Sequence, residues 1–220
     1  GIKRAIREFG IDTVVLDDAF QQWGIDKDID IVAIDANNPF GNRNMLPRGI
    51  LREPLSALKR AGIFLITKCN FDPDISGLKD FLKNINPQAQ IVVSIHKACG
   101  FVELTVKGTR ELRGKKAVLV SGIADPDFFE KVVRSQSVTV LDHIKFDDHH
   151  NYSSEDADKI MSTVLSKGAD TIITTEKDAV KLKDMFPAQT VVPVYSLKVE
   201  LEITQNEEEF NRRLLRVCAG

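Results

Sequence analysis

The sequence predicts an α/β protein of two lobes. Short apolar runs rich in β-branched residues alternate with helical segments along most of the 220 residues, which is the pattern of βαβ units around a parallel sheet. The alternation occurs twice, and two segments in which apolar and polar residues alternate, 101–106 and 197–203, flank the second run. These two segments indicate a two-stranded antiparallel connector, and with it a domain boundary near residue 100.

The first run is predicted from apolar strands and helical spacing. Its strands are short and β-branched, and its second helix repeats apolar residues at helical intervals. In chain order we expect a helix over 2–9, strands over 13–16 and 29–36, a helix over 54–61, a strand over 62–67, a helix over 75–85 and a strand over 90–95.

The second run is predicted largely from helix caps. Asp125 followed by Pro126 starts one helix, Ser153 with Asp156 forms a capping box for the next, and Thr175 caps a third. Strands are expected over 117–121, 138–141, 170–174 and 191–195, and a last helix over 207–217.

The composition is that of a globular protein and argues against a nucleic-acid partner. Apolar residues make up 43% and charged residues 28% of the chain, and the formal net charge is −2, whereas nucleic-acid-binding domains usually carry a basic excess. The cysteines, Cys69, Cys99 and Cys218, are far apart, so we expect reduced thiols rather than disulfides or a zinc site. No apolar run approaches the ~18 residues that cross a bilayer.

Two candidate sites lie in the first run. Asp17 and Asp18 follow the predicted strand over 13–16 directly, where parallel sheets bind ligands and where a carboxylate can hold Mg²⁺. The loop over 37–54 carries Arg43, Arg48 and Arg52, whose guanidinium groups suit phosphate, and Glu53, which could reach a metal. Each could equally be a solvated turn whose charges pair locally.

Two more candidate sites lie in the second run. In the segment over 146–152, Asp148 stands beside His149 and could orient an imidazole for base chemistry, although the same residues fit a metal site like that of the DHH phosphoesterases. The segment over 174–181 joins a strand end to a helix N-terminus, a geometry that favours anions, and Lys177 adds a positive charge. On physical grounds alone an ordinary capped helix is the preferred interpretation. His96 and His143 lie outside these segments and are expected to be structural.

Taken in order, these segments resemble the lipid A 4'-kinase (tetraacyldisaccharide 4'-kinase) family. Each matching piece is weak alone, but the ordered set is specific and spans nearly the whole chain. The pieces are Asp17-Asp18-Ala19-Phe20-Gln21, Leu46-Pro47-Arg48-Gly49, Leu51-Arg52-Glu53-Pro54, Thr67-Lys68-Cys69, Gly122-Ile123-Ala124, Phe146 with Asp148-His149-His150, and Thr174-Thr175-Glu176-Lys177-Asp178. The family's usual Gly and His are replaced by Ala19 and Gln22.

The resemblance implies a fold and an activity. The family is similar to P-loop NTPases in its first lobe and has a second, smaller α/β lobe joined by a two-stranded linker. By that resemblance, 1–97 would be the C-terminal part of the kinase lobe, 98–111 a linker strand, 112–196 the second lobe, and 197–220 the return strand and last helix. The reaction would be ATP- and Mg²⁺-dependent phosphorylation of the 4'-hydroxyl of a tetraacylated glucosamine disaccharide, in lipid A synthesis at the cytoplasmic face of the bacterial inner membrane.

The resemblance also assigns roles to residues. Those that would bind the nucleotide are Asp17, Asp18, Arg52, Glu53 and Lys177, with Asp18 and Glu53 near the metal. His149, with Asp148 as its neighbour, would support a catalytic Asp that precedes this segment. We expect the Asp17-Asp18 turn and the His149 loop to meet in a crevice between the lobes.

The family's phosphate-binding loop and membrane-associating helix are expected to precede residue 1, because the chain opens with Gly inside a predicted helix and contains no GxxxxGK[ST] motif. We therefore expect a fragment that is inactive and soluble alone and meets a membrane surface only in the full-length protein. Two alternatives stay open: a metal-dependent phosphoesterase, which would act without ATP, and a non-catalytic nucleotide-binding module.

Overall fold

The computed structural model describes residues 2–71, 73–104, 109–186 and 192–218, and the chain divides into two compact units. Unit 1 comprises Gly1–His96 and Leu201–Gly220, and unit 2 comprises Lys97–Glu200. Unit 2 is thus one continuous segment, while unit 1 is built from two segments that are separated in sequence.

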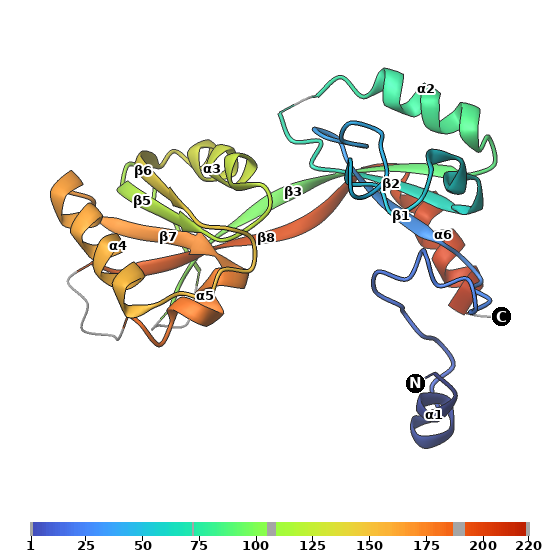
Figure 1. Ribbon diagram of the computed structural model, residues 1–220, viewed down its shortest axis with the longest axis horizontal. Coiled ribbons are helices and arrows are strands. Elements are labelled where there is room, and N and C mark those ends of the chain that lie inside the picture. The colour runs from blue at the N-terminus through green and yellow to red at the C-terminus, as the bar shows by residue number, and fades with distance from the viewer. Residues whose placement is uncertain (1, 72, 105–108, 187–191, 219–220) are drawn as a thin grey trace. The chain divides into compact units, whose positions relative to one another are not determined.

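Helices and strands alternate along the chain (Figure 1). In unit 1 and the shared strands the elements are α1 (Ile2–Phe9), β1 (Ile31–Asp35), the 3-10 helix η1 (Leu55–Arg60), β2 (Ile63–Thr67), α2 (Ser76–Ile85), β3 (Gln90–Glu103), β8 (Val194–Gln205) and α6 (Glu207–Cys218). In unit 2 they are β4 (Thr109–Arg110), β5 (Lys116–Ser121), α3 (Pro126–Ser135), β6 (Thr139–Lys145), α4 (Ser154–Lys167), β7 (Thr171–Thr175) and α5 (Glu176–Leu182).

The strands form a mostly parallel sheet in the order β1-β2-β3-β8-β7-β5-β6, with β4 paired to β3. The pairs β1–β2, β2–β3, β5–β6, β5–β7 and β7–β8 are parallel. Short strands joined by helices give this arrangement because parallel neighbours require a crossover. The α/β class and the parallel sheet predicted from the sequence are therefore confirmed.

Two long strands, β3 and β8, belong partly to each unit and are neighbours in the sheet. Within unit 2 the Leu104 N–H donates to the Val194 carbonyl at 3.0 Å, and within unit 1 the Thr204 hydroxyl donates to the Val93 carbonyl at 3.3 Å. Residue numbers rise along one strand as they fall along the other, so the pairing is antiparallel. The predicted antiparallel pair of strands is present, but it is part of the two longer continuous strands β3 and β8.

The core of unit 2 has two sides because strand side chains alternate between the faces of the sheet. Leu119 of β5 packs in one cluster with Val133 of α3, and its neighbour Val120 packs in another with Ile160 of α4 and Leu182 of α5. Figure 1 shows α3 on one side of these strands and α4 and α5 on the other. Each fully buried side chain of this size stabilises the fold by about 1.5–3 kcal/mol.

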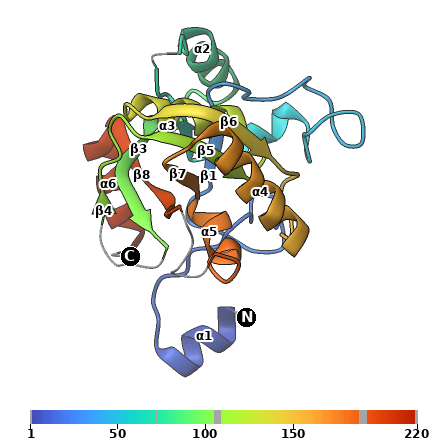
Figure 2. The ribbon, with the colours of Figure 1, turned by 90° about the vertical axis from the view of Figure 1, so that its left-hand side faces the viewer.

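The core of unit 1 forms under α2. Phe64 and Ile66 of β2, Ile34 of β1 and Leu82 of α2 are all buried and share one cluster. In contrast, α1 has no buried residue, and Figures 1 and 2 both draw it at the end of an extended segment, apart from the rest of its unit. Of the helices in the part of the chain that the structure describes, none has both the length and the apolar character to cross a bilayer.

One predicted strand is wrong. Residues 13–16 are irregular rather than extended in a sheet, and the Val15 side chain is 92% exposed. The β-branched run suits a strand, but that preference depends on packing against a neighbouring strand, and within the described residues no strand pairs with it.

Other boundaries differ less. The helix predicted over 54–61 is a short 3-10 helix, and the strands predicted over 90–95 and 101–106 merge into β3. Residues 105, 106 and 191 of the predicted strands lie outside the described residues.

Candidate active site

His149 and His150 lie in the loop between β6 and α4. The N-terminal cap of α4 anchors this loop. The Ser153 hydroxyl accepts from the Asp156 N–H, and the Asp156 carboxylate accepts from the Ser153 N–H, so the predicted capping box is confirmed. Asp156 also bonds the His150 Nε2 atom at 2.9 Å, and the His150 ring stacks on Phe146 with centroids 4.5 Å apart. His150 is therefore fixed by a partner that the sequence did not suggest.

His149 has the opposite character. Its side chain is 78% exposed, and its Nε2 atom lies 3.9 Å from Asp148 Oδ2, which is ion-pair range rather than a hydrogen bond. Its backbone has φ +64°, and its N–H lies 3.0 Å from Asp148 Oδ1 and 3.2 Å from the Gly122 carbonyl. The structure thus places Asp148 beside His149, with the imidazole open to solvent.

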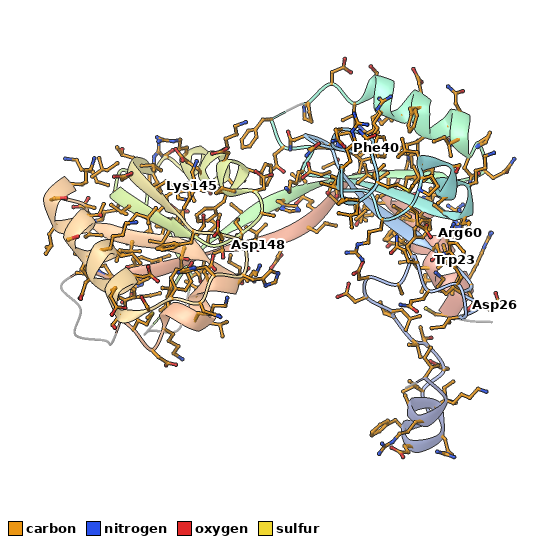
Figure 3. The ribbon with its side chains drawn as sticks, in the orientation of Figure 1. Trp23, Asp26, Phe40, Arg60, Lys145 and Asp148 are labelled. Carbon is orange, nitrogen blue, oxygen red and sulfur yellow. The ribbon has the colours of Figure 1, made fainter. Side chains whose placement is uncertain are left out.

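Helix α5 contacts this loop with two lysines. The Lys177 ammonium donates to Asp148 Oδ1 at 2.7 Å, and this hydrogen bond holds the pKa of the Asp148 carboxyl below its usual range. The Lys181 ammonium donates to the carbonyls of His149 at 3.1 Å and of His150 at 2.6 Å. Asp148 labels the position of the loop in Figure 3. Sequence reasoning gave Lys181 no role, because its partners lie about thirty positions away.

A buried polar cluster lies behind the loop. Asp178 is fully buried, accepts from the Gly122 N–H at 2.9 Å and from the Thr175 hydroxyl at 2.8 Å, and so joins the predicted Gly122 and Thr175 motifs. A Cβ on Gly122 would lie 3.2 Å from both Asp178 Oδ1 and the Tyr152 hydroxyl. Burial, together with the Asp178 charge, raises the pKa of the Tyr152 phenol, so this phenol stays protonated.

His143, which the sequence reasoning treated as structural, has two polar partners in the structure. The Ser121 hydroxyl lies 2.8 Å from its Nε2 atom, and Glu130 Oε2 lies 3.0 Å from its Nδ1 atom. Only 5% of the His143 side chain is exposed, and burial lowers its pKa against the opposing effect of Glu130. This array joins β5, β6 and α3, with both imidazole nitrogens occupied.

In unit 1, Asp17 and Asp18 form a turn after the irregular segment. Asp18 has φ +50°, and the Arg52 guanidinium donates to both of its carboxylate oxygens at 2.9 and 2.7 Å. Asp17 is exposed. The structure therefore brings together two predicted site residues, Asp18 and Arg52, although their side chains stay largely in solvent.

Glu53 is held by different partners from those of Asp18. Its Oε1 atom accepts from the Trp23 indole at 2.8 Å and its Oε2 atom from the Arg60 guanidinium at 2.6 Å. Arg60 also lies over the rings of Phe20 and Trp23, at 4.5 and 5.5 Å from their centroids, and Figure 3 labels Trp23 and Arg60 on the same side of the unit. The predicted loop is therefore joined to the segment after Asp18.

The carboxylates of Asp18 and Glu53 can supply part, but not all, of the ligands of a metal ion. Within the described ranges no three His, Cys, Asp or Glu side chains gather as a set of metal ligands. Mg²⁺ in nucleotide sites, however, uses one or two carboxylates and takes its other ligands from phosphates and water. Asp18 and Glu53 have the right oxygen donors, and both are already bonded to guanidinium groups that match phosphate.

The predicted residues thus form two groups. Asp17, Asp18, Arg52 and Glu53 belong to unit 1, and the loop with Asp148, His149 and Lys177 belongs to unit 2. A cavity of about 500 Å³ in unit 1 is lined by other residues, among them Cys69, Asn70 and Ile75.

Known proteins resemble the chain over its whole length. A sequence model of the family "Tetraacyldisaccharide-1-P 4'-kinase" matches residues 1–219. The tetraacyldisaccharide 4'-kinase of Halothermothrix orenii is 37% identical over 80% of this chain and 50% of its own length, and that of Desulfatibacillum aliphaticivorans is 33% identical over 96% of this chain and 58% of its own. The chain therefore spans about half the length of these relatives.

A solved structure supports the fold. A crystal structure of LpxK from Aquifex aeolicus in complex with ATP aligns with a TM-score of 0.65 at 21% identity, covering 98% of this chain and 60% of the other. At that identity the likeness concerns the fold, and it agrees with the predicted α/β architecture.

Proposed function

The chain belongs to the tetraacyldisaccharide-1-P 4'-kinase family, and from this premise we propose that it forms part of an enzyme that transfers the γ-phosphate of ATP to the 4'-hydroxyl of a tetraacylated glucosamine disaccharide. The observation that carries the proposal is the family match over residues 1–219. The motifs from Asp17 to Lys177 support it, because they occur in the order in which the family carries them.

In this proposal His149 supports the base that takes the proton from the sugar hydroxyl. An exposed imidazole next to a carboxylate suits that task, because it can orient or stabilise a partner group that approaches from solvent. Asp148 lies beside the imidazole at ion-pair distance, and its own charge is maintained by Lys177. Catalysis would rest mainly on positioning and on neutralising charge, as is general for phosphoryl transfer.

The Asp17-Asp18 turn, Arg52, Glu53 and Lys177 are proposed to bind the nucleotide. Bound Mg²⁺ would neutralise charge on the phosphates, and Asp18 and Glu53 are the residues that would hold it. Arg52 and Arg60 orient these carboxylates. Their guanidinium groups have the geometry to bind phosphate oxygens in place of the carboxylates.

The phosphate-binding loop would be supplied by other parts of the full-length protein, since the 220 residues contain no GxxxxGK[ST] motif. We expect the isolated chain to bind the nucleotide weakly and to turn over no substrate. We further propose that the full-length enzyme works at the cytoplasmic face of the bacterial inner membrane, where its lipid substrate lies, and that it has no nucleic-acid partner.

The experiment compares His149→Ala with Asn151→Ala in the full-length protein, using ATP, Mg²⁺ and the lipid disaccharide. Asn151 is an exposed neighbour in the same loop. We expect His149→Ala to lower kcat by a factor of 100 or more while the KM for ATP stays within about threefold, and Asn151→Ala to change neither. Near-wild-type turnover of the His149 variant would remove this residue from the mechanism.

A second comparison tests the two alternatives. A metal-dependent phosphoesterase would hydrolyse phosphate esters with Mn²⁺ or Zn²⁺ in the absence of ATP, and a non-catalytic module would bind ATP without turnover even at full length. The family match favours the kinase. Phosphate release without ATP, or binding without turnover by the full-length protein, would decide for one of the alternatives.

Combining Asp18→Asn with His149→Ala tests whether the two groups serve one reaction. Residues that act in one catalytic step show non-additive losses, so we expect the double variant to be hardly worse than the more damaged single one. Fully additive losses would indicate independent roles.

A further inference from the structure

Helix α5 has three side chains on the His149 loop or directly behind it. Lys177 and Lys181 stand one helical turn apart and so point to the same side, where they bond Asp148 and the two carbonyls of His149 and His150. Lys181 has two acceptors at 3.1 and 2.6 Å, both from the backbone. Its ammonium therefore holds the backbone at His149 and His150, and this contact does not involve the histidine side chains.

The same helix reaches the loop by a second route. Asp178 accepts from the Gly122 N–H, and the Gly122 carbonyl accepts from the His149 N–H. Asp178 is fully buried, so this route is shielded from water, whereas the Lys177–Asp148 pair is exposed and individually weak. The backbone of His149 is thus held at its N–H by the Gly122 carbonyl and at its own carbonyl by Lys181.

His149 depends on this support more than its neighbours do. Its φ of +64° lies in the left-handed region that residues with a Cβ rarely adopt, and its largely exposed side chain has little packing to hold it. Such a conformation persists only where surrounding contacts determine it. The direction of the imidazole is therefore set by the backbone, and the backbone is set by the contacts just described.

We propose that Lys181 is a positioning residue for His149: its ammonium, bonded to the His149 and His150 carbonyls, holds the left-handed backbone that aims the His149 imidazole. The proposal rests on the role of His149 in phosphoryl transfer given above. It assigns a task to the 174–181 segment, for which the sequence allowed two interpretations, an anion site and an ordinary capped helix.

The first test uses Lys181→Met in the full-length enzyme, with Lys183→Met as the matched control. Methionine keeps the length and apolar stem of lysine but donates no hydrogen bond, and Lys183 is an exposed lysine at the end of the same helix. We expect kcat to fall about tenfold or more for Lys181→Met, with the KM for ATP within twofold, and no change for Lys183→Met. Lys181→Arg, which keeps the donors, should recover most of the loss.

The second test separates positioning from a general structural role. In a His149→Ala background, Lys181→Met should cause no further loss, because there is no imidazole left to aim. A full additional loss in the double variant would overturn the proposal. If His149→Ala alone were fully active, the proposed function of His149 would fail first; if it were inactive while Lys181→Met kept wild-type kcat, only the positioning role would fail.

The third test needs no activity. In NMR spectra of the 220-residue chain, Lys181→Met should shift or broaden the His149 and His150 backbone and imidazole resonances, whereas Lys183→Met should leave them in place. Where Lys181→Met lowers the folded fraction, Lys181→Gln, which retains a donor of shorter reach, should shift the same signals in a folded chain. Unchanged His149 signals in both Lys181 variants would contradict the proposal.

Discussion

The guanidinium of Arg52 donates to both carboxylate oxygens of Asp18, at 2.9 and 2.7 Å, across 34 positions of sequence. The pair is exposed, with 56% of the arginine side chain and 64% of the aspartate side chain in contact with solvent. Exposed ion pairs contribute about 0–1 kcal/mol to stability, so this contact, in which the Arg52 Nη1 atom bonds both oxygens, points to orientation of the carboxylate rather than to stability.

Replacing Arg52 by Ala should therefore affect nucleotide binding more than folding. We expect the KM for ATP of the full-length enzyme to rise tenfold or more, and the free energy of unfolding of the 220-residue chain to change by less than about 0.5 kcal/mol. Steady-state kinetics and urea denaturation measure the two quantities. Arg113→Ala, at an exposed position of unit 2, is the control and should alter neither; an unchanged KM in Arg52→Ala would contradict the assignment.

A methyl group on Gly122 should disturb the buried cluster behind the His149 loop. The added Cβ would lie 3.2 Å from the Asp147 carbonyl, from Asp178 and from Tyr152, so the neighbours must move apart. We expect Gly122→Ala to lower the free energy of unfolding by about 1–3 kcal/mol, the usual range for overpacking. Gly77→Ala, whose Cβ would meet nothing within 4 Å, should be neutral or slightly stabilising in the same urea titration.

Acidification should destabilise unit 2 through His143. Burial lowers the pKa of this imidazole below its ordinary value of 6.5, so the unfolded chain binds a proton more readily than the folded one. Stability from this group is complete above pH 6.5 and declines as the pH falls toward the lowered folded-state pKa. Urea denaturation between pH 7.5 and 5 should show this loss, and His143→Gln should flatten the profile; equal slopes for both proteins would refute it.

Replacing Asp156 should lower the free energy of unfolding more than replacing Ser153, although both residues cap α4. Ser153→Ala removes one capping hydrogen bond and should cost about 1 kcal/mol of unfolding free energy. Asp156→Ala removes the reciprocal bond and also the partner of His150, so we expect a larger loss. Ser154→Ala, at an exposed position of the first turn, is the control, and thermal unfolding monitored by circular dichroism would rank the three.

The sequence predicts the second lobe well because its signals are local. Helix starts at Ser153 and Thr175 depend on residues three positions apart, and both caps form as expected. The strand over 13–16 fails for the opposite reason, since strand formation there requires a neighbour that no local pattern supplies. β3 and β8 are longer than predicted because they pair with each other beyond their apolar runs.

The candidate sites were predicted as motifs but not as networks. The pairing of Asp18 with Arg52 and of Asp148 with Lys177 follows from the fold, and no spacing rule gives it. For the same reason, the contacts of Lys181 and Asp156 with the His149–His150 loop could not be predicted from the sequence. Asp142 precedes His143 in the sequence, but the carboxylate that bonds the imidazole is that of Glu130, which reaches it only because α3 packs beside β6.

The interruption of unit 1 by unit 2 bears on the order in which the protein folds. During synthesis the last segment of unit 1, Leu201–Gly220, emerges only after the whole of unit 2. Unit 2, being continuous, has all its residues available earlier, and once folded it holds the ends of β3 and β8 next to each other. That replaces a roughly 100-residue loop by a short one, which by polymer scaling lowers the entropic cost of closing unit 1 by about 2–3 kcal/mol.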